Sequence, residues 1–141
     1  MLNHLTRKTV PTLLPRAAFW GLMTLACTSC GHDLPALPGF NAATWRADSY
    51  GCQNQRRQLL PILEKHRNAL YGSRINDITA LLGHPDEEEL GEQSDKVYIY
   101  YVAPGMHCAP GHPRSGSNRM LLRSGATGTI TEIILPVIKF D

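Results

Sequence analysis

The sequence has almost no excess charge of either sign. Its 141 residues include 14 Lys and Arg and 12 Asp and Glu, a net charge of +2. Three of the basic residues, Arg7, Lys8 and Arg16, stand in an N-terminal segment that contains no acidic residue; without that segment, 11 basic and 12 acidic residues leave a net charge of −1. A domain with this balance lacks the basic surface that a phosphate backbone requires. We therefore expect no nucleic-acid partner.

Signatures of common enzyme classes are also missing. The chain contains no Gly-x-Ser-x-Gly, no His-Glu-x-x-His and no phosphate-binding loop. Glu87, Glu88 and Glu89 are adjacent in an acidic segment, residues 86–95, which we expect to be a solvated turn rather than a pair of carboxylates facing each other across a cleft. The sequence therefore indicates a protein that is not an enzyme and holds no cofactor.

The chain has no hydrophobic run of the length that spans a membrane. Residues 17–26 are uncharged and mostly apolar, but a membrane-spanning helix needs ~20 such residues. A basic arm before a short apolar run, with small residues at its end, is typical of an export signal. We predict a signal peptide over residues 1–26; a buried core helix is the alternative interpretation.

The end of this apolar run resembles the lipobox of bacterial lipoproteins. In Leu25-Ala26-Cys27 a small residue precedes a cysteine, which in that family is acylated and becomes the first residue of the mature chain. Cys30 is the alternative acceptor. Acyl chains bury methylene groups at ~0.8 kcal/mol each, so several chains give an effectively permanent anchor. The resemblance implies a lipid-anchored protein of the cell envelope. We expect the outer membrane, with the domain facing the periplasm, and the inner membrane is the alternative.

Residues 27–43 are expected to join this anchor to the folded domain as a tether. Pro35, Pro38 and Gly39 disfavour both a helix and a central strand in this stretch. The alternative is a loop packed on the domain through Leu34, Leu37 and Phe40.

Two helices are predicted at the start of the domain, which we place at residues 44–141. Apolar residues at three- and four-residue spacing predict a helix over 48–70. A shorter helix follows at 74–82, with Ser73 as its N-cap and Gly83 just past its end.

Three strands are predicted after the acidic segment. Residues 97–102 are rich in β-branched and aromatic side chains, and residues 119–123 and 129–138 are further candidates with a hairpin turn at 125–128 between them. The order of elements predicts an α+β fold, in which two helices pack on a three-stranded antiparallel sheet.

A set of residues in this domain resembles the SmpA/OmlA domain, the BamE-like lipoprotein family. The pattern is a glycine, a short helix that ends in Leu-Gly-x-Pro, and a Tyr-rich strand. The resemblance implies a non-enzymatic module that faces the periplasm and supports outer-membrane assembly or envelope integrity by binding another envelope protein. The two-helix, three-strand unit is also similar to that of β-lactamase inhibitor proteins. The residues that carry the motif are Gly72, Ile78, Leu82, Gly83 and Pro85.

The segment Met106 to His112 is the most suggestive for metal chemistry. His107, Cys108 and His112, with Met120 as a distant axial ligand, look like the ligand set of blue-copper proteins, and thiolate, imidazole and thioether ligands favour copper. This metal-binding lipoprotein is the alternative to the binding module.

The competing interpretation of Cys108 is structural. With Cys27 and Cys30 assigned to the anchor and the tether, Cys52 and Cys108 are the two cysteines of the domain. Thiols of an exported chain meet an oxidising compartment. We therefore predict a Cys52–Cys108 disulfide and no metal; this bridge would contribute ~4 kcal/mol by the chain-entropy argument.

Overall fold

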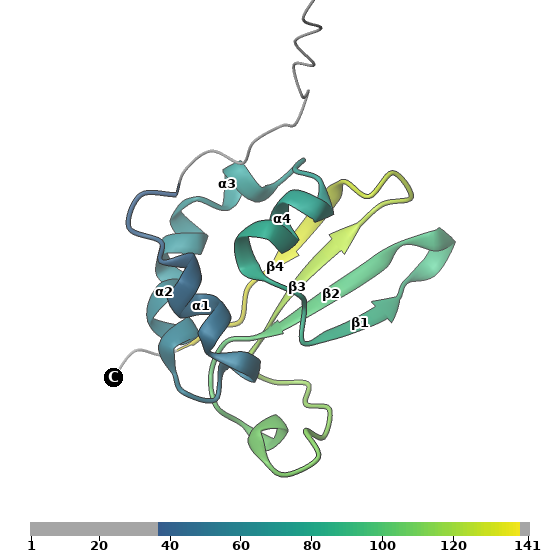
Figure 1. Ribbon diagram of the computed structural model, residues 1–141. Helices are drawn as coiled ribbons and strands as arrows, with labels where there is room; N and C mark the ends of the chain where they lie inside the picture. The colour runs from purple at the N-terminus through teal and green to yellow at the C-terminus, as the bar shows by residue number, and fades with distance from the viewer. Residues whose placement is uncertain (1–36, 139–141) are drawn as a thin grey trace, which may run out of the picture. The chain divides into compact units, whose positions relative to one another are not determined.

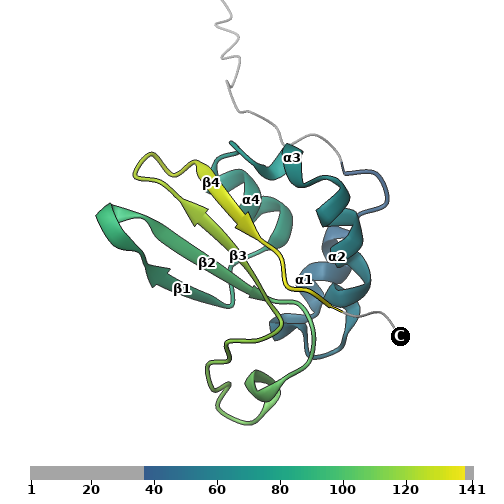
Figure 2. The same cartoon turned by 180° about the vertical axis from the view of Figure 1, so that it is seen from behind.

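The computed structural model describes residues 37–138 (Figure 1), so the predicted signal peptide, Cys27 and Cys30 lie outside the described residues. The described part is an α+β domain, as predicted. Its helices pack against one face of an antiparallel sheet, and the face seen in Figure 2 carries no α-helix. Within these residues the α-helices are α1 (Ala42–Ala47), α2 (Gln55–Lys65), α3 (Arg67–Leu70) and α4 (Ile75–Leu82), and short 3₁₀ helices span Ser49–Gly51, Glu92–Ser94 and Met106–Cys108.

The single helix predicted over residues 48–70 is wrong, because the chain turns sharply before α2. Asp48 is fully buried, and its carboxylate accepts hydrogen bonds from the backbone N–H groups of Gln53, Gln55 and Arg56 at 2.7–2.9 Å. Two of these groups belong to the first turn of α2, whose N–H groups have no partner within the helix. Asp48 therefore fixes a turn and caps the helix that follows it.

The second predicted helix is present, although its start differs from the expectation. Helix α4 ends at Gly83, which adopts a φ of 83°, a conformation that favours glycine. Ser73 is not the N-cap: Arg74 occupies that position, and the Ser73 hydroxyl donates to the Ala69 carbonyl at 2.9 Å.

The sheet has four strands in the order β1-β2-β3-β4, and every neighbouring pair is antiparallel. The predicted three strands correspond to β2 (Lys96–Tyr101), β3 (Arg119–Ser124) and β4 (Ile130–Ile134). The three-strand prediction is wrong because β1 (Glu87–Leu90) lies in the acidic segment that was expected to be a turn. Glutamate has a low intrinsic strand propensity, but charged side chains suit the edge of a sheet, where they oppose pairing with other chains.

The core lies between the helices and the sheet face that carries Tyr98, Tyr100, Leu122 and Ile133. Leu37 is 8% exposed and joins this core, and Phe40 packs against it. Residues 37–43, which were predicted to be tether, are therefore part of the folded domain, as the alternative of a packed loop predicts for Leu37 and Phe40. The other fully buried large side chains of the cluster are Trp45, Leu63, Leu70, Ile78, Leu82, Met120 and Ile130.

The residues of the family motif have structural positions in this core. Gly72 lies between α3 and α4 with a φ of 79° and donates its N–H to the Ile130 carbonyl at 2.9 Å. Ile78 and Leu82 are fully buried on the inner side of α4. Gly83 and Pro85 connect α4 to β1. All five residues therefore contribute to the packing of α4 on the sheet.

Candidate functional site

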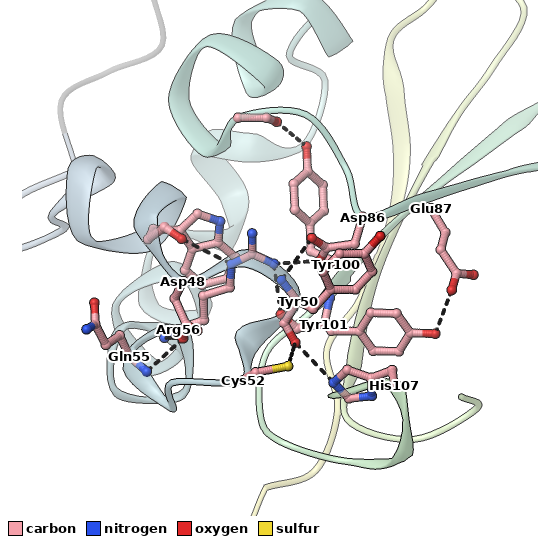
Figure 3. A network of polar contacts seen from close by, with 12 residues as sticks. Asp48, Tyr50, Cys52, Gln55, Arg56, Asp86, Glu87, Tyr100, Tyr101 and His107 are labelled. Carbon is pink, nitrogen blue, oxygen red and sulfur yellow. Dashed lines mark hydrogen bonds and ion pairs between the residues drawn. The ribbon is translucent and has the colours of Figure 1, made fainter. Parts of the chain in front are cut away.

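A buried ion pair joins the helices to the sheet. Arg56 on α2 contacts Asp86 at 2.5 Å, and their side chains are 3% and 6% exposed. The Asp86 carboxylate also accepts the backbone N–H groups of Tyr50 and Tyr101, as Figure 3 shows. The Arg56 guanidinium donates to the carbonyls of Trp45 and Tyr101. Since these charges are paired and hydrogen-bonded inside the fold, we assign them a structural role.

Next to this ion pair, a disulfide connects Cys52 to Cys108, with their Cα atoms 5.7 Å apart. These are the two cysteines predicted to pair, and the separation is normal for a bridge. Cys52 follows the 3₁₀ helix Ser49–Gly51, and Cys108 ends the 3₁₀ helix Met106–Cys108 in the long loop between β2 and β3. The bridge therefore fastens this loop to the turn before α2.

Four aromatic rings stack beside the disulfide. His107 lies against Tyr101 with a centroid distance of 3.8 Å, and Tyr50 lies between Tyr101 and His112, at 6.2 and 4.1 Å. The Tyr101 hydroxyl donates to Glu87 and accepts from the Ser115 N–H, both at 2.9 Å. Burial, partly offset by the bond from Ser115, raises the pKa of Tyr101. The stack covers one end of the helix-free face of the sheet.

The structure does not assemble the predicted copper ligands as a group. Cys108 is part of the disulfide. His112 stacks on Tyr50, and its Nδ1 donates to the His107 carbonyl at 2.8 Å. Met120 is fully buried in the core on the other side of β3. The cluster that does form contains Cys52, His107 and Cys108, whose ligand atoms all lie within 4.8 Å of one another.

The remaining part of the helix-free face presents partly exposed aliphatic side chains. The strand register aligns Leu121 of β3 with Ile134 of β4 on this face, next to Ile99 of β2, which is fully buried. Ile134 is 44% exposed, and an ion pair between Arg123 and Glu132 lies beside it at 2.9 Å. We call the following residues the open patch: Val97, Leu121, Arg123, Glu132 and Ile134.

Two surface hollows are relevant to the kind of ligand that the described residues could bind. The open patch surrounds one of about 20 Å³, and a second of about 220 Å³ lies between α2 and residues 135–138, lined by Leu60, Pro61 and Val137 among others. Both are smaller than the ~300–1,000 Å³ typical of small-molecule sites. The open patch is therefore better suited to a flat protein surface than to an enclosed ligand.

The roles of Arg56 and Asp86 and the open patch were not predicted from the sequence. An arginine and an aspartate 30 positions apart carry no local pattern that would pair them. The patch depends on the exact register of β2, β3 and β4, which was not predicted. The alternation of Arg119-Met120-Leu121-Leu122-Arg123 gave a partial signal, because such alternation separates the two faces of a strand.

Among the helices of residues 37–138, none has the length and hydropathy of a membrane span. Comparison of the chain with protein-family models, with curated proteins and with solved structures finds no match.

Proposed function

We propose that this chain is an exported lipoprotein, anchored through Cys27, whose domain is a non-enzymatic protein-binding module of the cell envelope. The resemblance to the SmpA/OmlA, BamE-like family suggests a periplasm-facing position at the outer membrane. It also suggests a role in outer-membrane assembly or envelope integrity.

The open patch is the observation that carries the binding role. Its centre is aliphatic, with Leu121 and Ile134 in one row, and its border carries charges of both signs from Arg123 and Glu132. An apolar centre with a polar rim is the usual composition of a protein interface. The helices cover only the opposite face of the sheet (Figures 1 and 2), so a partner has access to this side.

The disulfide supports the export part of the proposal. Disulfides persist in secreted and periplasmic proteins and are rare in the reducing cytosol. The Cys52–Cys108 bridge joins segments 56 positions apart in the sequence, and the loop that it closes contains α2, α3, α4, β1 and β2. This fits a small domain that works outside the cytoplasm, as the leader also suggests.

Site-specific cross-linking in living cells tests the binding role. A photoreactive residue replaces Ile134 in the open patch or, as a matched control, Gln58, which is exposed on α2. We expect a discrete cross-linked envelope protein from position 134 and none from position 58. An Arg123→Glu change in the same protein should weaken that adduct, because it places two acidic residues side by side. Equal adducts from both positions, or none from position 134, would contradict the proposal.

Lipid labelling tests the anchor separately. Cells given an alkyne-tagged palmitate should label the wild-type protein and the Cys30→Ser variant. The Cys27→Ser variant should remain an unlabelled precursor. Labelling of Cys27→Ser, with loss in Cys30→Ser, would move the anchor to Cys30. No labelling of any form would overturn the lipoprotein assignment.

A further inference from the structure

The cluster of Cys52, His107 and Cys108 has a composition that the structural role of the disulfide does not explain. One ligand atom from each residue lies within 4.8 Å of the other two. The cysteines are partly exposed, whereas His107 is fully buried. A disulfide needs no imidazole beside it, and burying a polar ring costs free energy unless its nitrogens have partners.

The hydrogen bonds of His107 define its tautomer. Nε2 lies 3.0 Å from the Tyr50 carbonyl oxygen, and since a carbonyl only accepts, Nε2 carries the proton. Nδ1 is buried and has no hydrogen-bond partner among the described residues. The Cys52 Sγ atom lies 3.6 Å from the same Tyr50 oxygen. Figure 3 shows this sulfur and Nε2 converging on that oxygen from two sides.

This arrangement matches the donor set of a soft-metal site once the sulfurs are free. Thiolate and imidazole are the ligands that Zn²⁺ and Cu⁺ prefer in proteins. A tetrahedral ion with metal–sulfur bonds of ~2.3 Å holds two sulfurs about 3.8 Å apart. Cys52 lies in a turn and Cys108 at the end of a 3₁₀ helix in a loop. The sulfurs therefore reach that spacing without breaking a strand.

We propose that reduction of the disulfide converts this cluster into a site for one soft metal ion, Zn²⁺ or Cu⁺, bound by Cys52, Cys108 and Nε2 of His107. A protein dithiol gives two electrons and two protons to the Cys52–Cys108 bond and becomes a disulfide itself, leaving two thiols here. The metal ion then replaces the thiol protons, which pass to solvent. The Nε2 proton moves to Nδ1 of the same ring. Because Nδ1 makes no hydrogen bond to the described residues in the oxidised protein, this transfer breaks no hydrogen bond at Nδ1.

This site differs from the copper site expected from the sequence. The new set includes Cys52, which lies far from Cys108 in the chain, and excludes His112, whose ring stacks on Tyr50. His112 is therefore the matched control: a histidine of the same loop that should not bind the ion. In the oxidised protein the site is closed, because both sulfurs are joined to each other.

Cobalt titration of the reduced full chain tests the proposal. Cys27 and Cys30 are replaced by Ser so that they add no thiolate, and a phosphine reductant avoids a competing thiol. We expect one Co²⁺ per chain, with a thiolate-to-cobalt charge-transfer band that Zn²⁺ abolishes. A chromophoric Cu⁺ chelator in a second titration decides between the two ions. The oxidised protein should show no band.

Variants of the same background identify the ligands. His107→Gln should weaken cobalt binding at least about tenfold, Cys52→Ser and Cys108→Ser should reduce the charge-transfer band, and His112→Gln should change neither. Circular dichroism checks folding. As a second measurement, Zn²⁺ should slow alkylation of the two thiols in the parent and not in His107→Gln. No band in the reduced parent, or equal affinity of the parent and His107→Gln, would overturn the proposal.

Discussion

The buried Arg56–Asp86 pair leads to a quantitative prediction for Arg56→Met. This change removes the guanidinium and its hydrogen bonds to Asp86 and to the carbonyls of Trp45 and Tyr101. Asp86, 6% exposed, would then have no cation in contact. Breaking one side of such a pair costs ~3–5 kcal/mol, which is a large part of the ~5–15 kcal/mol that stabilises a typical domain.

Arg123→Met is the matched control for this experiment. Arg123 also forms an ion pair, with Glu132, but the two side chains are 40% and 46% exposed. Exposed pairs contribute at most ~1 kcal/mol. Urea unfolding of the oxidised protein, followed by circular dichroism, should show a much lower midpoint for Arg56→Met than for Arg123→Met. Free energies of unfolding that agree within ~1 kcal/mol would refute the argument that burial decides the contribution of these pairs.

Three further changes test the rest of the fold. Reduction of the Cys52–Cys108 bridge, which closes a separation of 56 residues, should lower the free energy of unfolding by about 4 kcal/mol; an unchanged urea midpoint would contradict this. Leu82→Ala, in a fully buried position, should cost ~2–5 kcal/mol, whereas Leu90→Ala, at 84% exposure, should cost little; the same urea assay compares them. Burial raises the pKa of Tyr100, so its protonated form stabilises the fold below the ordinary phenol pKa of ~10, and thermal stability should fall as the pH rises above that value. A flat profile from pH ~9 to ~11 would contradict this expectation.

The cysteine pairing could be predicted from the number of cysteines and from the oxidising compartment that an exported chain meets. The sequence contains four cysteines, and the leader and the lipobox resemblance assigned two of them to the anchor and the tether. The remaining two are the pair that the structure joins. Which histidine lies next to these cysteines could not be predicted in the same way. His107 and His112 both lie within four positions of Cys108 in the sequence. Only the packing of the loop buries the first ring beside the sulfurs and stacks the second on Tyr50.

The elements whose signals are local could be predicted from the amino-acid pattern. Helix α4 and its end at Gly83, the Tyr-rich strand β2 and the hairpin between β3 and β4 follow from residue spacing, turn glycines and β-branched side chains. These signals depend on contacts within a few residues, so the amino-acid pattern contains them directly.

Other features depend on contacts between residues that are far apart in the sequence, and these appear only in the tertiary structure. The acidic strand β1 forms because β2 offers it hydrogen bonds, and the buried Asp48 turns the chain where helical spacing predicted a continuous helix. Leu37 was predicted to lie in the tether, but it packs in the core because it makes apolar contacts there. The Arg56–Asp86 pair requires two segments to meet in a buried position. In each case the stabilising partner is remote in the sequence, so the free energy that selects the conformation has no local pattern.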